Sequence, residues 1–373
     1  MFPVSSMKVL IVTAMYPKPE NPAFGSFVRT QVESLRRAGV DVELLLLQGR
    51  SRKWNYLKAI FQLRERLAKG SFDLVHAHYG LAGMVGRTEW KVPVVVTFHG
   101  DDLLGTVNTR GKKTLLSALI VAAGRRLARS VDAVIVQSQE MARKLESEAH
   151  RYNGNQAEAV IVKSRDMASK LKRENVHIIP HEIDFDVFQP VEKEQARALL
   201  GLDPHKKYLL FAANPKIPVK RFPLAQAVAE ELQKQDPSVE LLAIYKETQD
   251  RLALFMSACD ALIFTSYQEG SPNIVKQAMA CNLPIVSTDV GDVRDVIGST
   301  KGCYVCKPDV KEFAEILAGA LSPGERTRGR EKVRHLSGPA VAQKVIAVYE
   351  QVLSRRKRHA VDRLQGKPVS AGK

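Results

Sequence analysis

The sequence predicts an α/β protein of two domains, each built on a parallel sheet that helices cover on both faces. A chain of 373 residues is too long for one ordinary domain and fits two domains of roughly 150–200 residues. Short, nearly continuous apolar runs alternate with helical stretches in both halves, as parallel strands buried on both faces require. The rhythm breaks at PHEIDFDVFQP, residues 180–190, so we place the domain boundary between residues 182 and 183.

The first domain, residues 1–182, contains six predicted strands. They are MKVLIVTAMY (7–16), VDVELLLL (40–47), FDLVHAHY (72–79), VPVVVTFHG (92–100), VDAVIVQS (131–138) and VHIIP (176–180). The stretch SFVRTQVESLRRAG after the first strand has helical spacing of Phe27, Val28, Val32 and Leu35, and Gly39 ends it.

The second domain, residues 183–340, repeats this scheme. Its predicted strands are KYLLFAA (207–213), VELLAIY (239–245), ALIFTSY (261–267) and LPIVSTD (283–289). A C-terminal helix is predicted over residues 341–358, followed by a basic tail at 359–373 that we expect to be disordered. Ligands of open parallel sheets bind at the carboxyl ends of the strands, so the cleft between two facing sheets is the expected site.

One segment of the first domain is duplicated. AVIVQSQEMARKL at 133–145 recurs as AVIVKSRDMASKL at 159–171, with nine of thirteen positions identical. One sheet has a single place for this strand before residues 176–180, so one copy is predicted to be displaced or loosely held.

The formal charge of +16 calls for an anionic partner. Only 6% of residues are aromatic and no nucleic-acid motif occurs, which disfavours specific nucleic-acid binding. Phosphorylated small molecules and an anionic membrane surface remain, and the basic stretches 124–129 and 354–359 suit lipid headgroups. Solvated basic faces explain the same charges equally well.

The four cysteines are interpreted as small buried residues of a protein in a reducing cytoplasm. Cys303 and Cys306 form a C-x-x-C, but no second pair lies where tetrahedral zinc would need it. No apolar run approaches the ~20 residues of a membrane-spanning helix. Residues 1–6 lack the features of a signal peptide and are interpreted as an N-terminal extension.

The most informative stretch is EGSPNIVKQAMACNLPIVSTDVGD, residues 269–292. Ser271 suits a helix N-cap and Pro272 the first helical position, while Asn282 suits a left-handed stop. The helix would therefore begin beside the cleft, where its free N–H groups form an anion site that phosphate usually occupies. Glu269 either accepts hydrogen bonds from sugar hydroxyls or complements its own helix, and these residues alone do not separate the two. Asp292 and Asp295 could cap the next helix.

This stretch resembles the donor-site signature of glycosyltransferase family 4 (glycosyltransferases group 1). The resemblance extends to MKVLIVTAMYP with Gly25, TFHGDD at 97–102, AVIVQS, IPHEIDFDVFQP and the segment 214–222. The EGSPN form is most similar to bacterial surface-polysaccharide members of the teichuronic-acid type. The family implies the GT-B fold, in which two Rossmann-like domains face a central cleft.

The resemblance also implies roles for individual residues. Glu269 would bind the donor sugar, Lys220 would stabilise the departing diphosphate, and His99 would face the reacting sugar. The remaining implied donor contacts are Gly25, Asn214, Arg221, Gly270, Ser271, Pro272, Asn273 and Gln277, and the implied acceptor contacts are Ser26 and Asp101. Without the family, a Lys-Arg pair after a strand is usually solvated, and His76 and His78 suit satisfied histidines of the cleft wall better than metal ligands.

The sequence departs from the family pattern in three places. Gln277 stands where a second glutamate would hold the nucleotide ribose, which predicts weaker donor binding. Asn214 and Pro215 stand where an arginine is usual, and His181-Glu182 replaces an Asn-Gly turn whose residues tolerate positive φ.

The function expected from the family is retaining transfer of a hexose-type unit, without a metal or other cofactor. The donor would be a nucleoside diphosphate sugar of the UDP or GDP type, and the acceptor a glycan or lipid-linked hydroxyl in surface polysaccharide synthesis. We expect a cytoplasmic protein, peripheral on the inner face of the plasma membrane. Alternatives are a catalytically weak or silent nucleotide-sugar-binding protein and a GT-B sugar-nucleotide epimerase.

Overall fold

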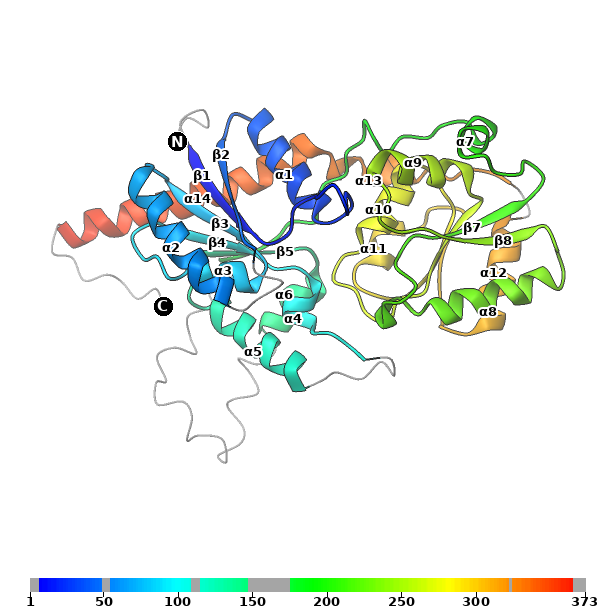
Figure 1. Cartoon of the computed structure of the whole chain (residues 1–373), viewed down its shortest axis with the longest axis horizontal. Coiled ribbons are helices and arrows are strands. Elements are labelled where there is room, and N and C mark those ends of the chain that lie inside the picture. The colour runs from blue at the N-terminus through cyan, green and yellow to red at the C-terminus, as the bar shows by residue number, and fades with distance from the viewer. Residues whose placement is uncertain (1–6, 49–53, 109–114, 147–174, 322–323, 365–373) are drawn as a thin grey trace.

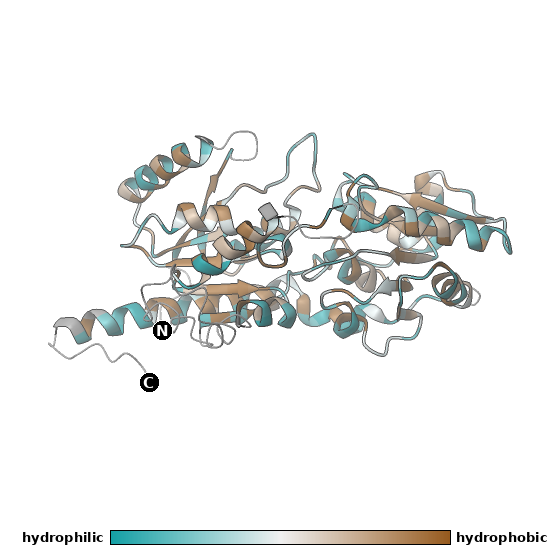
Figure 2. Ribbon diagram, turned by 90° about the horizontal axis from the view of Figure 1, so that it is seen from below, coloured by the Kyte–Doolittle hydropathy of each residue, from teal (hydrophilic) through white to brown (hydrophobic). Residues whose placement is uncertain are grey.

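Two α/β domains lie side by side in the computed structural model (Figure 1). The structure describes residues 7–48, 54–108, 115–146, 175–321 and 324–364. Both sheets are parallel throughout. Strands are predominantly brown in Figure 2 and helices alternate between teal and brown, as expected for buried strands and half-buried helices.

The N-terminal sheet has six strands in the order β2-β1-β3-β4-β5-β6. Their bounds are β1 Lys8–Thr13, β2 Asp41–Leu46, β3 Leu74–His78, β4 Val94–Thr97, β5 Ala133–Val136 and β6 Val176–Ile178. One face packs on α2 (Trp54–Lys69), α3 (Gly80–Gly86), α4 (Gly100–Leu104), α5 (Leu115–Ala128) and α6 (Gln139–Glu146). The other face packs on α1 (Ser26–Arg37) and on the C-terminal helix α14 (Gly338–Leu364).

The C-terminal sheet has five strands in the order β11-β10-β9-β7-β8. Their bounds are β7 Lys207–Phe211, β8 Val239–Ala243, β9 Ala261–Phe264, β10 Ile285–Thr288 and β11 Cys303–Cys306. Its helices are α7 (Lys193–Leu200), α8 (Phe222–Gln233), α9 (Gln249–Ala258), α10 (Asn273–Ala280), α11 (Val293–Ile297), α12 (Val310–Leu321) and α13 (Gly329–Val333), with short 3-10 turns η5 (Pro218–Lys220) and η6 (Arg334–Leu336).

The predicted α/β architecture is confirmed, and each of the ten predicted strands occurs within its expected range. Gly39, at φ 92°, ends the first helix as expected. The prediction missed β11, because the residues CYVC were interpreted as a C-x-x-C pair and not as an apolar run. All four cysteines are buried free thiols.

The chain crosses between the domains twice. The first crossing follows β6, and Ile183 already packs in the core of the C-terminal domain. The second leads from η6 into α14, which returns to pack on α1 and the N-terminal sheet. The helix is longer at both ends than the predicted 341–358. The two crossings touch, because the backbone N–H of Ile183 donates to the carbonyl of Leu336 over 2.8 Å.

The first copy of the duplicated segment fills the place between β4 and β6. It forms β5 and α6, with β5 paired to β4 on one side and to β6 on the other. The second copy, residues 159–171, lies outside the described residues, as do residues 1–6 and 365–373. Its predicted displacement therefore stays a prediction.

Candidate active site

The carboxyl ends of the two sheets meet through two loops. Gly100 follows β4 and Gly270 follows β9, and a Cβ built on Gly270 would lie 3.1 Å from the Gly100 Cα and 2.8 Å from the Met141 Sδ. Beside this contact, the Gln268 amide donates to the carbonyl of Gly105 over 2.8 Å. Residues adjacent to the predicted His99 and Glu269 thus touch across the domain interface, and a Cβ at either glycine would be crowded by the opposite loop.

Lys220 and Glu269 form an ion pair at this edge. The Lys220 Nζ donates to the Glu269 Oε1 over 2.5 Å, and their side chains are 26% and 16% exposed. The two residues stand 49 positions apart, so this pairing is a product of the fold. The predicted cation and carboxylate of the donor site therefore occupy one place.

Backbone contacts fix the turn that carries Lys220. The Thr265 hydroxyl donates to the carbonyls of Lys220 and Arg221, and the Tyr267 N–H donates to the Val219 carbonyl over 2.8 Å. Arg221 adopts a left-handed conformation, with φ 51°, and its guanidinium lies 4.1 Å from the centre of the Tyr267 ring. η5 is thus attached to the segment that leads into α10.

The start of α10 differs from its prediction by one position. Pro272 is the N-cap and Asn273 the first helical residue, so the predicted N-cap role of Ser271 is wrong. The Ser271 hydroxyl instead donates to the Asp292 Oδ2 over 2.6 Å and accepts from the Lys276 ammonium. Asp292 occupies the N-cap position of α11 without a side-chain cap bond. The predicted stop at Asn282 is confirmed by its φ of 55°.

Lys276 is a site residue that sequence reasoning missed. Its side chain is 1% exposed, and its ammonium lies 3.5 Å from Asp292 in addition to the Ser271 contact. Burial lowers the pKa of Lys276, and the neighbouring Asp292 partly offsets that shift. A buried cation beside the first turn of α10 adds to the positive end of the helix dipole. The sequence carries no signal for its burial, because residue 276 lies off the apolar stripe that Ile274, Val275, Ala278 and Met279 form.

Three buried oxygens of the segments around α10 have no protein partner. They are the Ser266 Oγ, the Asn273 Oδ1 and the Asp292 Oδ1. Buried polar atoms are nearly always hydrogen-bonded, so such a group of acceptors is suited to a ligand rich in hydroxyl groups.

The N-terminal edge of the interface is a chain of buried histidine rings. The His99 Nδ1 lies 3.1 Å from the His181 Nε2, and its Nε2 lies 3.4 Å from the His78 Nδ1. His76 contacts the Tyr349 hydroxyl at 2.6 Å and the Thr97 hydroxyl at 2.7 Å. Burial holds the pKa of all four rings below the ordinary value, for His78 at about 3. Both nitrogens of His99, the predicted catalytic residue, therefore face other histidines.

Asp102 is a second group that the sequence prediction missed. It accepts from the His99 backbone N–H over 3.1 Å, and burial raises the pKa of its carboxyl to about 7. The predicted acceptor residue, Asp101, is exposed in the first turn of the same helix. A carboxyl three residues after His99 was the available signal, because that spacing suits a capping box.

The hinge residues His181 and Glu182 do not have the strained backbone expected from an Asn-Gly replacement, since neither has positive φ. Their side chains bind the N-terminal domain instead. The His181 ring stacks on His99 at an interplanar angle of 7°, and Glu182 accepts from the Ser34 hydroxyl over 2.8 Å. Burial raises the pKa of Glu182 to about 7.

The other predicted site residues lie at the same edge with simpler contacts. Gly25 has φ 67° and its Cα packs against the backbone of Met15 and Tyr16, so the close approach it permits is to the chain itself. Ser26 begins α1, and the Asn214 Oδ1 accepts from the Lys216 N–H over 3.0 Å. Gln277 is half-buried in α10, one turn beyond Asn273.

No group of three or more His, Cys, Asp or Glu side chains within the described ranges is placed to hold a metal ion.

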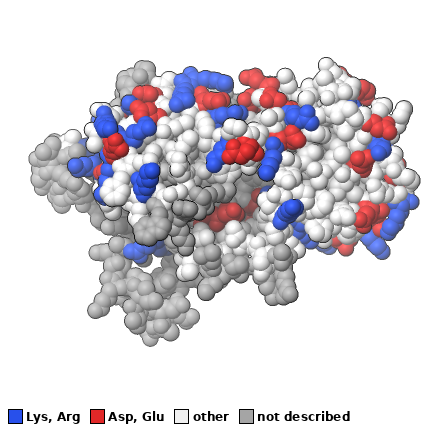
Figure 3. Space-filling model, in the orientation of Figure 1, with Lys and Arg blue, Asp and Glu red and all other residues white. Residues whose placement is uncertain are grey.

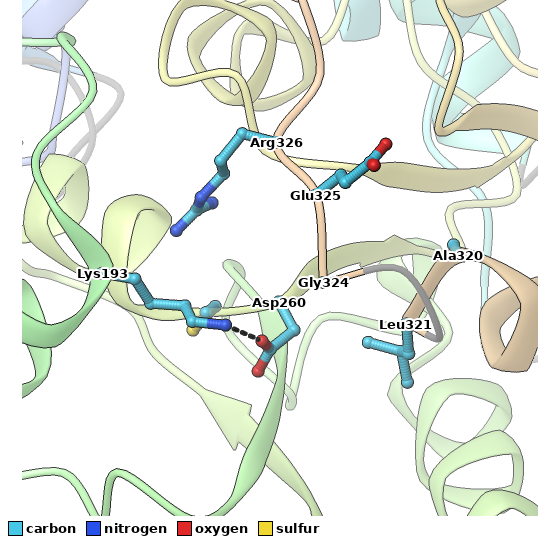
Figure 4. Close-up of a pocket in the computed structure, with 8 residues that line it drawn as sticks. Lys193, Asp260, Ala320, Leu321, Gly324, Glu325 and Arg326 are labelled. Atoms are coloured by element: carbon cyan, nitrogen blue, oxygen red, sulfur yellow. Dashed lines mark hydrogen bonds and ion pairs between the residues drawn. The ribbon is translucent and has the colours of Figure 1, made fainter.

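A separate hollow, lined by residues that include Lys193, Asp260 and Arg326, lies at the other end of the C-terminal sheet (Figure 4). Asp260 precedes β9 and binds Lys193 and Arg197 of α7 over 3.0 and 2.8 Å. These ion pairs therefore fix α7 to the amino end of the sheet, away from the interdomain cleft. Figure 3 shows both signs of charge interspersed on one face of the molecule, with acidic side chains in the hollow between the domains.

Known families match both halves of the chain. The glycosyl transferase 4-like domain matches residues 7–148 and the glycosyl transferases group 1 model matches residues 209–322, which together make up more than half of the chain. TuaC of Bacillus subtilis, a glycosyltransferase described for teichuronic acid biosynthesis, is 23% identical over 83% of this chain and 88% of its own.

Solved structures share the fold. Sucrose-phosphate synthase from Thermosynechococcus elongatus superposes with a TM-score of 0.70 at 18% identity, over 94% of this chain and 100% of that one. HepE from Anabaena, solved with UDP, gives 0.61 at 16% identity, over 94% and 100% of the two chains. With both family models in chain order and two facing parallel sheets, the protein belongs to glycosyltransferase family 4 and has the GT-B fold.

Proposed function

We propose that this glycosyltransferase moves a hexose-type sugar from a nucleoside diphosphate sugar, of the UDP or GDP type, to a hydroxyl of a glycan or lipid-linked acceptor. The product would enter surface polysaccharide, and the reaction would retain the anomeric configuration without a metal. The likeness to TuaC supports the acceptor class, and the UDP complex of HepE supports the donor class.

The pairing of Lys220 with Glu269 beside the start of α10 carries this proposal. When the glycosidic C–O bond breaks, negative charge develops on the departing diphosphate. Lys220, the buried Lys276 and the free N–H groups of α10 supply positive charge where it would be needed. Glu269 would exchange part of its contact with Lys220 for hydroxyls of the sugar.

Retention and metal independence rest on the family resemblance of the sequence. The positive groups around α10 are compatible with both, because fixed cations can neutralise a diphosphate without Mg²⁺. A cytoplasmic location at the inner membrane face is proposed on the same ground. In the described part of the chain, no helix is both long and apolar enough to cross a bilayer.

A thermal-shift screen over UDP-, GDP-, ADP- and CMP-sugars, with and without EDTA, tests the proposal. One nucleotide series should raise Tm, because ligand at 100 times its Kd stabilises by about 2.7 kcal/mol. Lys220→Met should reduce the shift, whereas Lys206→Met, which removes a surface pair with Glu240, should not. Product formed with the stabilising donor would then be examined by NMR for its anomeric configuration.

Failure of both the UDP- and the GDP-sugars to stabilise the protein would contradict the proposed donor. An inverted product would contradict retention, and activity lost in EDTA and restored by Mg²⁺ would contradict metal independence.

A further inference from the structure

Large apolar side chains are exposed on one face of the N-terminal domain. Leu57 and Phe61 of α2 are 51% and 70% exposed, Leu81 of α3 is 52% exposed, and Leu119 and Ile120 of α5 are 61% and 43% exposed. On the opposite face, α1 and α14 expose only Val361 among their described large apolar residues. Monomeric proteins scatter such residues singly, so five on neighbouring helices require an explanation.

These five residues, here named the outer apolar face, share one helical layer. α2 contacts α3, and α3 contacts α5, while their buried sides pack in the same core. Leu57 and Phe61 are one turn apart and therefore point the same way. On α5, Leu119, Ala122 and Arg126 follow the same spacing, and all three are exposed.

Cations accompany these apolar residues. Lys58 and Arg64 are exposed on α2, where the exposed Glu65 is paired with Lys69 over 2.6 Å. Arg126 is exposed on α5, whose sequence contains no acidic residue. The other basic stretch, 354–359, lies on α14 across the sheet, where Arg356 binds Asp132 over 3.0 Å. Only the stretch at 124–129 therefore adjoins the outer apolar face.

We propose that the outer apolar face docks this protein on an anionic lipid membrane. Leucine, isoleucine and phenylalanine side chains would enter the boundary between headgroups and acyl chains, while Lys58, Arg64 and Arg126 would contact lipid phosphates. A net charge of +16 favours such a surface over a neutral one.

The position of the outer apolar face relative to the cleft supports a membrane as its partner. α4 packs on α5, and the Gly105 carbonyl at the end of α4 accepts from Gln268 of the candidate active site. A lipid-linked acceptor could therefore pass from the membrane to the cleft along α4. The docking deepens the proposed location at the inner membrane face, and this last step also rests on the proposed transfer to a lipid-linked acceptor.

Cosedimentation with vesicles tests the docking. The full chain would be mixed with phosphatidylcholine vesicles and with vesicles containing about a third phosphatidylglycerol. The double variant Leu119→Ser/Ile120→Ser is compared with Leu199→Ser, a matched change at a residue of α7 that is 64% exposed. Circular dichroism and gel filtration check folding and oligomeric state.

We expect wild type and Leu199→Ser to bind the anionic vesicles equally, and the double variant to partition at least about tenfold more weakly. Arg126→Gln should weaken partitioning about fivefold. Equal binding by all variants, or no binding by wild type, would overturn the proposal. So would a wild-type dimer that the double variant converts to a monomer without lipid binding, because a second copy would then cover the face. Donor-induced Tm shifts measured without lipid decide the proposed function separately.

Discussion

The two sheets present opposite chemistries at equivalent edges. The N-terminal edge carries stacked, buried histidines whose pKa values burial keeps low. The C-terminal edge carries the ion pair of Lys220 with Glu269 and the contact of Lys276 with Asp292. The same position in the same kind of fold thus holds neutral rings in one domain and charges in the other.

This difference separates two tasks. Charged groups near a cleft can interact strongly with a phosphate, because few waters screen them. Neutral rings contribute shape and hydrogen bonds but little field. We therefore expect loss of charge at the C-terminal edge to affect catalysis most, and changes at the N-terminal edge to affect stability and its pH dependence.

The largest effect should follow Glu269→Ala. The rate of transfer, measured as kcat with the best donor, should fall about 10³-fold, because the carboxylate would bind the sugar in the transition state. The free energy of unfolding should change by less than about 1 kcal/mol, since the freed Lys220 is 26% exposed and can be hydrated.

Glu247→Ala is the matched control for this variant. It removes a surface carboxylate that binds Arg251 over 2.9 Å, and it should leave kcat unchanged. If Glu269→Ala instead loses much stability but little rate, the role of Glu269 is to stabilise the N-terminus of α10.

The next largest effect should be a loss of stability in acid. A histidine whose folded pKa lies below its unfolded value binds fewer protons when folded, so stability falls as pH drops below about 6.5. Each such ring contributes a slope of about 1.4 kcal/mol per pH unit. Asp102 and Glu182, with pKa values raised to about 7, oppose this slope between roughly pH 4.5 and 7.

His78→Gln isolates one ring of this set. The slope of unfolding free energy against pH between 6 and 5, from urea melts, should fall by about 1.4 kcal/mol per pH unit. His205→Gln, at an exposed residue, should leave the slope unaltered. An unaltered slope in both variants would show that His78 is not held neutral in the folded protein.

Gln277→Glu should strengthen the charged edge slightly. A charged acceptor adds about 1 kcal/mol to a hydrogen bond with a ribose hydroxyl, which corresponds to about fivefold tighter donor binding. Isothermal titration would measure Kd, with Gln235→Glu on an exposed loop as the control. An unchanged Kd would show that residue 277 does not contact the ribose of the donor.

The smallest effect should come from deleting residues 146–171. The first copy of the repeat, which holds β5 and α6, would remain, so the free energy of unfolding should change by less than about 1 kcal/mol. Deleting 133–158 instead leaves a chain of equal length with the second copy in its place. That variant should be about 2 kcal/mol less stable, because Lys163 would replace Gln137, which is 2% exposed. If the variant that lacks residues 146–171 fails to fold, this segment is required for the fold.

The strands could be predicted from the sequence for a physical reason. Parallel strands buried on both faces are continuous apolar runs, and such runs are visible without tertiary information. The segment 269–282 was equally readable, because its acid, proline and asparagine have positional meaning. The family resemblance then supplied Lys220, which no local pattern would have assigned.

Two of the remaining errors involve partners that are distant in sequence. Ser271 did not become an N-cap because Asp292, 21 residues later, and Lys276 compete for its hydroxyl. The hinge was expected to be strained, but the contacts of His181 and Glu182 lie 82 and 148 residues away. Local sequence carries no signal for such contacts.

The paired crossings also make the C-terminal domain a closed insertion within the N-terminal one. Its first and last residues, near Ile183 and Leu336, are hydrogen-bonded neighbours, so it enters and leaves through one narrow strap. Rotation of one domain about the long axis of the molecule would break the hydrogen bond between these two segments. A hinge motion that opens and closes the cleft would only bend them. Any relative motion of the two domains must therefore move both crossings together, and we expect it to bend this connection more readily than to twist it.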